Sequence, residues 1–259
     1  MGIQLKLQSL RTSLRRNSKP IVDNIIENHI QRNKKPNVRS KICMFCSSPA
    51  NVTKEHVLPR WVFEKDPDRF FVTDVNGLGQ TYNRTTIPAC VNCNSDILNS
   101  LETFISQLLD GIDVKKTPFS IEESENIIRW LEIIDYKFQI LDVVRVFKTS
   151  KQAGHIPFLS DYPISVLRAS MDYSPSKVIA EIRRSQNRIT TKNKNQNINS
   201  LVTFKTSNKG FNFFHQINDF IFLELPQKHV AFFYFYHKTF ANEVIAHKEA
   251  MEIIKQFYN

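Results

Sequence analysis

Apolar residues recur at helical spacing in several parts of the chain. Between residues 97 and 109 they lie three or four positions apart, which predicts a helix directly after the last cysteine. Ser120 and Glu123 form a capping-box pattern ahead of a long run with apolar residues around much of the helix. We therefore expect a long helix from about Ser120, central to the protein. Residues 239–257 predict a C-terminal helix, and residues 21–30 a short one.

Short runs rich in Phe, Val, Ile and Tyr, separated by turn residues, predict β-strands in the C-terminal half. They cover residues 178–182, 200–206, 210–216, 220–225 and 230–236. The phenylalanines among them are more typical of a sheet core than of a platform that stacks bases. The whole pattern predicts an α+β fold, in which a small module accompanies a larger α+β body with a long central helix, antiparallel strands and a C-terminal helix.

Changes in composition divide the chain into three predicted segments. Residues 1–40 form a basic N-terminal arm that passes into a polar linker at about residues 33–41. Residues 41–112 form a compact module that carries every cysteine of the chain. Residues 113–259 form an α+β body, for which we expect a recognition or regulatory role.

The charge of the chain indicates an anionic partner. The net charge is +10, and residues 1–42 carry ten Lys or Arg against two Asp or Glu, hence +8 of that total. A basic arm can add contacts with the phosphates of such a partner, each of which strengthens binding in a salt-dependent way. A solvated tail that only keeps the protein soluble is the alternative. Because no run of eighteen apolar residues occurs, we expect no membrane span and a cytoplasmic location.

The four cysteines fall in two C-x-x-C pairs, Cys43 with Cys46 and Cys90 with Cys93. Thiolates bind Zn²⁺ tetrahedrally, and a two-residue gap lets one tight turn direct both sulfurs at the same ion. The two pairs together predict a closed structural Zn²⁺ site that stabilises a segment poor in apolar residues. The alternative is two unrelated pairs that are redox-active or occur by chance. A thioredoxin-like role for one pair, however, does not explain why the chain has a second pair.

A Glu-His dipeptide lies between the cysteine pairs. Glu55-His56-Val57 is followed by Pro59, and Asn94 comes directly after the second pair. The order C-x-x-C, Glu-His-Val-x-Pro, C-x-x-C-Asn resembles the HNH nucleases of the His-Me (ββα-metal) finger superfamily. The resemblance covers residues 43–102, less than a quarter of the chain, and it is specific because five separate elements recur in order.

The resemblance implies a role for each matching residue. His56 corresponds to the general base that deprotonates water, and Glu55 to the acidic residue that binds a catalytic divalent ion. Asn94, at the start of the helical part of the motif, corresponds to a second ligand of that ion. The implied activity is hydrolysis of phosphodiester bonds in DNA with Mg²⁺ or Mn²⁺, and imidazole, carboxylate and amide groups suit that chemistry. Compact HNH proteins with an extra domain often resemble bacterial or phage defence effectors and restriction-type enzymes.

The chain departs from the HNH pattern at one position. The middle Asn of the motif has no clean match, because Thr85 and Thr86 stand there and Asn83 lies slightly earlier. Glu102 follows Asn94 by eight residues on about the same helical face, and we expect it to be solvated rather than to orient a ligand.

Three alternatives remain open at this level. The first is a non-catalytic zinc-finger protein that retains the HNH outline and binds nucleic acid or a protein partner. The second is a nuclease that is active only with a regulatory partner or as a homodimer. The third is RNA, or single strands, as the target instead of duplex DNA.

Overall fold

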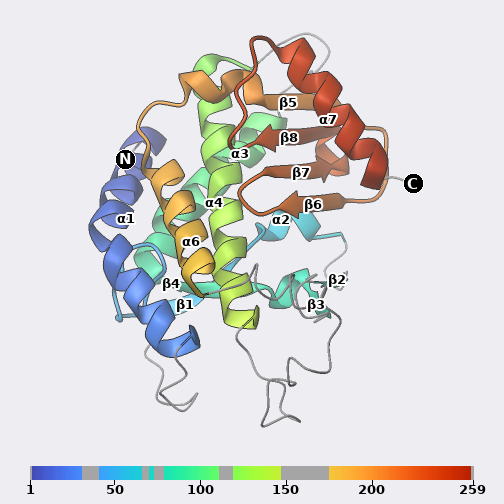
Figure 1. Ribbon diagram of the computed structural model, residues 1–259. Helices are drawn as coiled ribbons and strands as arrows, with labels where there is room; N and C mark the ends of the chain where they lie inside the picture. Colours follow the sequence, from blue (N-terminus) through green and yellow to red (C-terminus); the bar gives the residue numbers. More distant parts are fainter. Residues whose placement is uncertain are drawn as a thin grey trace.

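The computed structural model describes residues 2–30, 41–65, 70–72, 79–110, 119–146 and 175–257. Helices combine with antiparallel sheets, which confirms the predicted α+β class, and a C-terminal helix closes the chain (Figure 1). No helix among these residues is long and apolar enough to cross a bilayer.

The cysteine-bearing segment contains two strands followed by a helix. Strand β1 (Val52–His56) pairs antiparallel with β4 (Thr86–Cys90). The chain then enters a π-helical stretch, η4 (Asn92–Leu98), that continues as α3 (Asn99–Asp110). Between β1 and β4 lie four short elements: α2 (Arg60–Phe63), the hairpin strands β2 (Phe70–Val72) and β3 (Gly79–Thr81), and η3 (Tyr82–Arg84).

Helix α4 (Ile121–Val146) runs through the centre of the protein, as its apolar pattern predicts. Its capping box forms: Glu123 N donates to Ser120 Oγ at 3.2 Å, and Ser120 N donates to Glu123 Oε2 at 2.7 Å. Every residue from 126 to 141 is buried, because neighbours surround the helix. Figure 1 shows helices α1 and α6 along one side of α4 and the four-stranded sheet along the other.

The four-stranded sheet has the order β5-β8-β7-β6. Its strands are β5 (Leu201–Lys205), β6 (Asn212–Gln216), β7 (Phe220–Leu225) and β8 (Val230–Phe235). Alternate side chains go to opposite faces, as strand geometry requires. Phe222 and Phe233 pack under helix α7 (Glu243–Phe257), while Leu223 and Phe232 belong to the main core. The prediction that these phenylalanines form a sheet core is confirmed.

Residues 178–182 are helical, so the strand predicted there is wrong. They belong to α6 (Pro175–Thr190), in which Ile182 and Ile189 are buried. Val178, Ile182 and Ile189 recur every four or seven positions, so they share one face of a helix, and that face packs on α4. A five-residue window contained too little of this pattern to separate it from a strand.

The N-terminal segment is not a free arm over residues 3–30. Helix α1 (Ile3–Ile25) continues into the π-helical η1 (Ile26–Ile30), and together they extend far beyond the short helix predicted at residues 21–30. Its buried residues are Leu7, Leu10, Leu14, Ile21, Val22 and Ile25. They pack against α6 and α3, and the cations Arg15, Arg16 and Lys19 are exposed away from that face. The predicted linker at residues 33–41 lies, apart from Lys41, outside the described residues.

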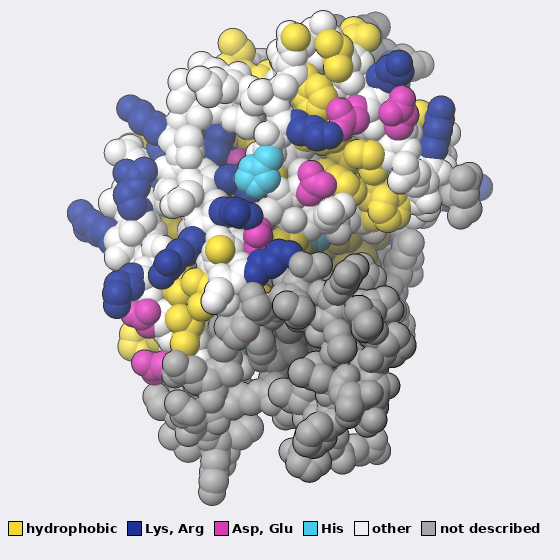
Figure 2. All heavy atoms as spheres, viewed as in Figure 1, with side chains coloured by type: hydrophobic (Ala, Val, Ile, Leu, Met, Phe, Trp, Pro, Cys, Tyr) yellow, Lys and Arg dark blue, Asp and Glu magenta, His cyan; other side chains and the backbone are white. Residues whose placement is uncertain are grey.

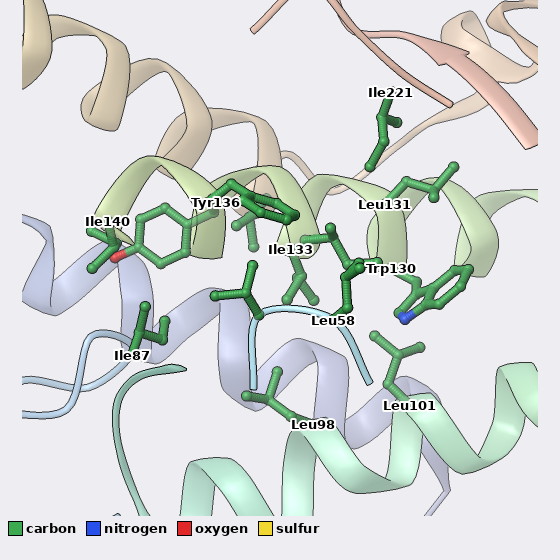
Figure 3. Packing of buried hydrophobic residues seen from close by; sticks show 14 of the residues in the cluster. Leu58, Ile87, Leu98, Leu101, Trp130, Leu131, Ile133, Tyr136, Ile140 and Ile221 are labelled. Atoms are coloured by element: carbon green, nitrogen blue, oxygen red, sulfur yellow. The ribbon is translucent and has the colours of Figure 1, made fainter. Parts of the chain in front are cut away.

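All three predicted segments contribute to one hydrophobic cluster. It contains Leu14 of the first segment, Leu98 of the second and Trp130 of the third. In Figure 3, Leu58 and Leu101 of the cysteine-bearing segment point toward Trp130 and neighbouring side chains of α4. The cysteine-bearing segment therefore packs on the body, and α4 can contribute groups to any site built on that segment.

Candidate functional site

The four cysteines meet at one point. Cys43 and Cys46 lie in the turn before β1, Cys90 ends β4, and Cys93 lies in the first turn of the helix that follows. Their sulfur atoms all lie within 4.8 Å of one another, and Cys46 Sγ is 3.6 Å from Cys90 Sγ. Zn–S bonds of about 2.3 Å place the sulfurs of a tetrahedral site about 3.8 Å apart. The cluster could therefore hold a metal ion such as zinc.

The first cysteine pair is shaped by a tight turn. Ser47 N donates to Cys43 O at 2.9 Å, and Cys43 N donates to Ser48 O at 2.8 Å. Phe45 N points at Cys43 Sγ at 3.4 Å, and Ser47 has a positive φ of 57°. A backbone N–H aimed at sulfur stabilises the thiolate, which is the form that binds metal.

The ionisation of the cysteines also favours a bound cation. A hydrogen bond from Cys93 is the main cause that lowers the pKa of Cys43 to about 5. Burial raises the pKa of Cys46 to about 12, and the charge on Cys43 adds to this effect. The hydrogen bond with Cys43 is the main cause that raises the pKa of Cys93, and burial adds to this effect. The cluster therefore accommodates one thiolate readily, and further ionisation requires a positive charge among the sulfurs.

A cavity of about 690 Å³ opens beside β1 and the start of the following helix, and its lining includes Glu55, His56, Arg60, Asn83, Asn94 and Glu102. Glu55, His56 and Asn94, which the sequence singled out, therefore border one space. Adjacent residues of a strand point in opposite directions, but β1 ends at His56 and the chain turns there. Glu55 is buried on the inner side, while His56 remains partly exposed.

His56 is held by the backbone of Asn83. Its Nε2 lies 3.2 Å from Asn83 O, and since a carbonyl can only accept, Nε2 carries the proton and Nδ1 the lone pair. Burial is the main cause that lowers the pKa of His56, and the nearby Arg60 cation lowers it further. The imidazole is therefore mostly neutral near pH 7. No residue that orients His56 was evident from the motif, because Asn83 acts from η3, ahead of the position at which the motif has its middle Asn.

Asn94 joins the helix to β1. Its Nδ2 donates to Thr53 Oγ1 at 2.9 Å and to Lys54 O at 3.3 Å. These bonds fix which end of the amide is nitrogen, so Oδ1 is the atom that can accept or bind a cation. Asn94 lies within the π-helical stretch Asn92–Leu98, a winding that often occurs at functional sites.

A lysine of α4 lies under the cavity. Lys137 Nζ contacts Glu55 Oε1, and it donates to Glu102 Oε1 at 3.2 Å and to His56 O at 3.1 Å. The expectation that Glu102 is solvated is wrong, since its side chain is only 19% exposed and forms this ion pair. Burial raises the pKa of Glu102, and the charge on Glu55 adds to it, whereas Lys137 opposes the shift.

Lys137 stays charged in this setting. Burial disfavours the ammonium, but Glu55 and Glu102 outweigh that effect and raise the pKa of Lys137 above its ordinary value. Neither the motif nor the spacing of residues had indicated Lys137 as part of the site. The available signal was a lysine in the middle of the apolar run of α4, a position at which a charge usually has a buried partner.

Two further residues of the motif region border the cavity. Arg60 begins α2 and is exposed at the rim. Trp61 stacks on Trp130 of α4 with ring centroids 5.7 Å apart, so it packs the cysteine-bearing segment against the body.

The chain was compared with protein-family models, with curated proteins and with solved structures, and none of the three comparisons finds a match.

Proposed function

We propose that this protein is a metal-dependent endonuclease of the HNH type that hydrolyses phosphodiester bonds in DNA. One observation carries the proposal: Glu55, His56 and Asn94 border the same polar cavity, and Asn94 directly follows Cys93 of the four-cysteine cluster. These residues come from positions up to 39 apart in the chain, so chance surface residues would not be expected to meet in this way.

The residues at the cavity suit a hard divalent cation such as Mg²⁺ or Mn²⁺. Glu55 offers a carboxylate and Asn94 an amide oxygen, and such oxygen ligands, completed by water, are those that these ions prefer. Lys137 contacts only Oε1 of Glu55, so Oε2 is the oxygen for the ion. When bound, the ion would neutralise charge on the phosphate and on the departing oxygen.

His56 would act as the general base. Its Nδ1 takes a proton from a water molecule while the water oxygen forms a bond to phosphorus and the P–O bond to the leaving oxygen breaks. The leaving oxygen takes a proton from solvent and His56 returns its proton to solvent, which completes the hydrolysis and restores the base. The hydrogen bond to Asn83 O holds the imidazole in the tautomer that this step needs.

The cysteine cluster would have a structural role. With four sulfur ligands a zinc ion has no open position for water or substrate, so it would not take part in hydrolysis. It would instead hold the turn before β1 against the start of the helix that carries Asn94. The geometry of the cavity would then depend on the zinc although the chemistry would not.

A cluster of exposed cations supports DNA as the partner. Helices α1 and α6 pack together, and Lys and Arg side chains gather over this part of the surface in Figure 2. Exposed cations on these helices include Arg15, Arg16, Lys19, Arg183 and Arg184. Such a surface attracts the phosphate backbone without regard to sequence.

A plasmid-nicking assay tests the proposal. Wild-type protein should nick supercoiled DNA with Mg²⁺ or Mn²⁺ and not with EDTA, and His56→Ala should lower the rate at least about 100-fold, because a general base contributes that much. His215→Ala is not a neutral comparison because His215 binds Asp135, so the exposed His247 serves as the control position. Unchanged nicking by His56→Ala would exclude His56 as the base. DNA binding without cleavage in any divalent ion would favour the non-catalytic alternative.

A further inference from the structure

A lysine from the central helix reaches the candidate metal site. Lys137 of α4 has a side chain that is only 1% exposed, and its ammonium meets three oxygens, those of Glu55, Glu102 and the His56 backbone. An ammonium has three N–H donors, so each has an acceptor. The lysine thus connects β1, α3 and α4 at one atom and fixes the strand end that carries Glu55 and His56.

The ion pairs of Lys137 with Glu55 and Glu102 also set the net charge of the site. Two carboxylates lie against one ammonium, so Lys137 cancels one of the negative charges that would otherwise face the cavity. In oxygen-ligand sites the affinity for a divalent cation rises with the negative charge of the ligands and with the rigidity of the site. Lys137 therefore increases rigidity while it reduces the attraction for a cation.

We propose that Lys137 is a positioning residue that holds Glu55 and lowers the charge of the site, so that the divalent ion binds firmly only when a DNA phosphate adds anionic oxygen. This inference rests on the proposed function. The free protein would hold the ion loosely, and DNA binding and metal binding would strengthen each other by the same factor. Lys137 is not a catalytic residue, since it acts through Glu55.

The experiment measures Mn²⁺ binding directly. The full chain, loaded with zinc and carrying His56→Ala to prevent cleavage, is titrated with Mn²⁺ while electron paramagnetic resonance follows the free ion. The titration is made with and without a short DNA duplex. We expect the duplex to lower the Kd for Mn²⁺ at least about tenfold.

Two substitutions should shift this Kd in opposite directions. Lys137→Met removes both the positive charge and the contact that holds Glu55. Because the gain in negative charge should outweigh the loss of rigidity, Mn²⁺ should bind about tenfold more tightly without DNA, and the effect of the duplex should shrink. Glu102→Gln removes a negative charge and should weaken Mn²⁺ binding about tenfold. With His56 intact, Lys137→Met should also lower kcat for nicking at least about tenfold, because Glu55 loses its fixed position.

Lys194 provides a matched control. It is also a buried lysine that binds a carboxylate of α4, with 2.7 Å between its Nζ and Glu132 Oε1, and its side chain is 3% exposed. It is not among the residues that line the described cavity. Lys194→Met should lower stability and leave the Kd for Mn²⁺ unchanged.

The outcomes separate the two proposals. If wild-type protein nicks DNA but Lys137→Met and Glu102→Gln leave the Kd unchanged, or shift it in the same direction, the role of Lys137 is overturned and the proposed function stands. If Lys137→Met does not fold, the weaker binding of Glu102→Gln and the duplex effect in the parent protein still decide the question. If neither Mn²⁺ binding nor nicking occurs with or without DNA, the proposed function fails, and this inference fails with it.

Discussion

Two carboxylates of this protein are buried beside cations, and their surroundings differ. Asp135 of α4 is fully buried, and its two oxygens meet four donors. His215 Nε2 and Asn218 N lie 2.9 and 3.3 Å from Oδ1, and Gln139 Nε2 and Arg188 contact Oδ2. This carboxylate has no acceptor capacity left for a ligand.

Glu55 shows the opposite arrangement. It is also buried, but the lysine beneath it contacts one oxygen, and the residue lines the cavity. The difference teaches how to separate structural from functional buried charges. A carboxylate saturated by protein donors stabilises the fold, whereas one that is held on one side and borders a cavity can still bind a ligand.

The largest effect should come from breaking the cysteine cluster that supports the Glu55 site. Cys93→Ser should reduce zinc from about one ion per chain to nearly none and lower Tm by more than about 10 °C, since zinc binding contributes directly to folding. Metal analysis and thermal unfolding measure both effects. Val91→Ala, at an exposed position between Cys90 and Cys93, should keep its zinc. Stoichiometric zinc in Cys93→Ser would show that the cluster is not the binding site.

The next-largest effects should distinguish the structural role of Asp135 from the functional role of Glu55. Asp135→Asn should lower the free energy of unfolding by about 3 kcal/mol at pH 7, because it leaves Arg188 buried without its counter-charge. At temperatures at which Asp135→Asn is still folded, its rate of DNA nicking should be within about twofold of that of wild type. Glu55→Gln should instead lower kcat at least about 100-fold. Equal losses of activity in the two variants would remove the distinction drawn between them.

The stability cost of Asp135→Asn should depend on pH. Burial alone would raise the pKa of Asp135, but Arg188 and His215 outweigh it and hold the pKa below its ordinary value. The native pKa is thus below the unfolded value of about 3.9, so the stabilisation is present above that value and is lost as pH falls through the native pKa. Urea unfolding at several pH values should show the gap between wild type and Asp135→Asn closing in acid.

The smallest effect should come from the rim of the cavity. Arg60→Ala should raise KM for DNA about three- to tenfold and reduce the salt dependence of binding by about one phosphate contact, with kcat nearly unchanged. Arg16→Ala removes another exposed arginine, on α1, far from Arg60 in the sequence. This variant tests whether cations outside the cavity contribute to DNA binding in the same way. A larger loss of kcat than of affinity in Arg60→Ala would place Arg60 nearer to the chemistry than its exposed position suggests.

Local pattern was enough for part of the architecture. The capping box at Ser120 and the long apolar run predicted α4, and short apolar runs rich in Phe between turn residues predicted β5 to β8. The strand predicted at residues 178–182 was wrong, because a short apolar run has no clear period until its whole length is considered. The basic N-terminal segment was misjudged for a related reason: its charge obscured the leucines that face the core.

The spacing of the cysteines along the chain already determined that four sulfurs could gather, because a C-x-x-C turn directs both of its sulfurs to one point. The resemblance of the surrounding motif to HNH nucleases indicated Glu55, His56 and Asn94 as candidate site residues. Only the folded chain revealed that Asn83 holds His56 and that Lys137 lies against Glu55. Lys137 is 82 positions from Glu55, and a contact over that distance depends on how α4 packs against the cysteine-bearing segment, which no local periodicity encodes.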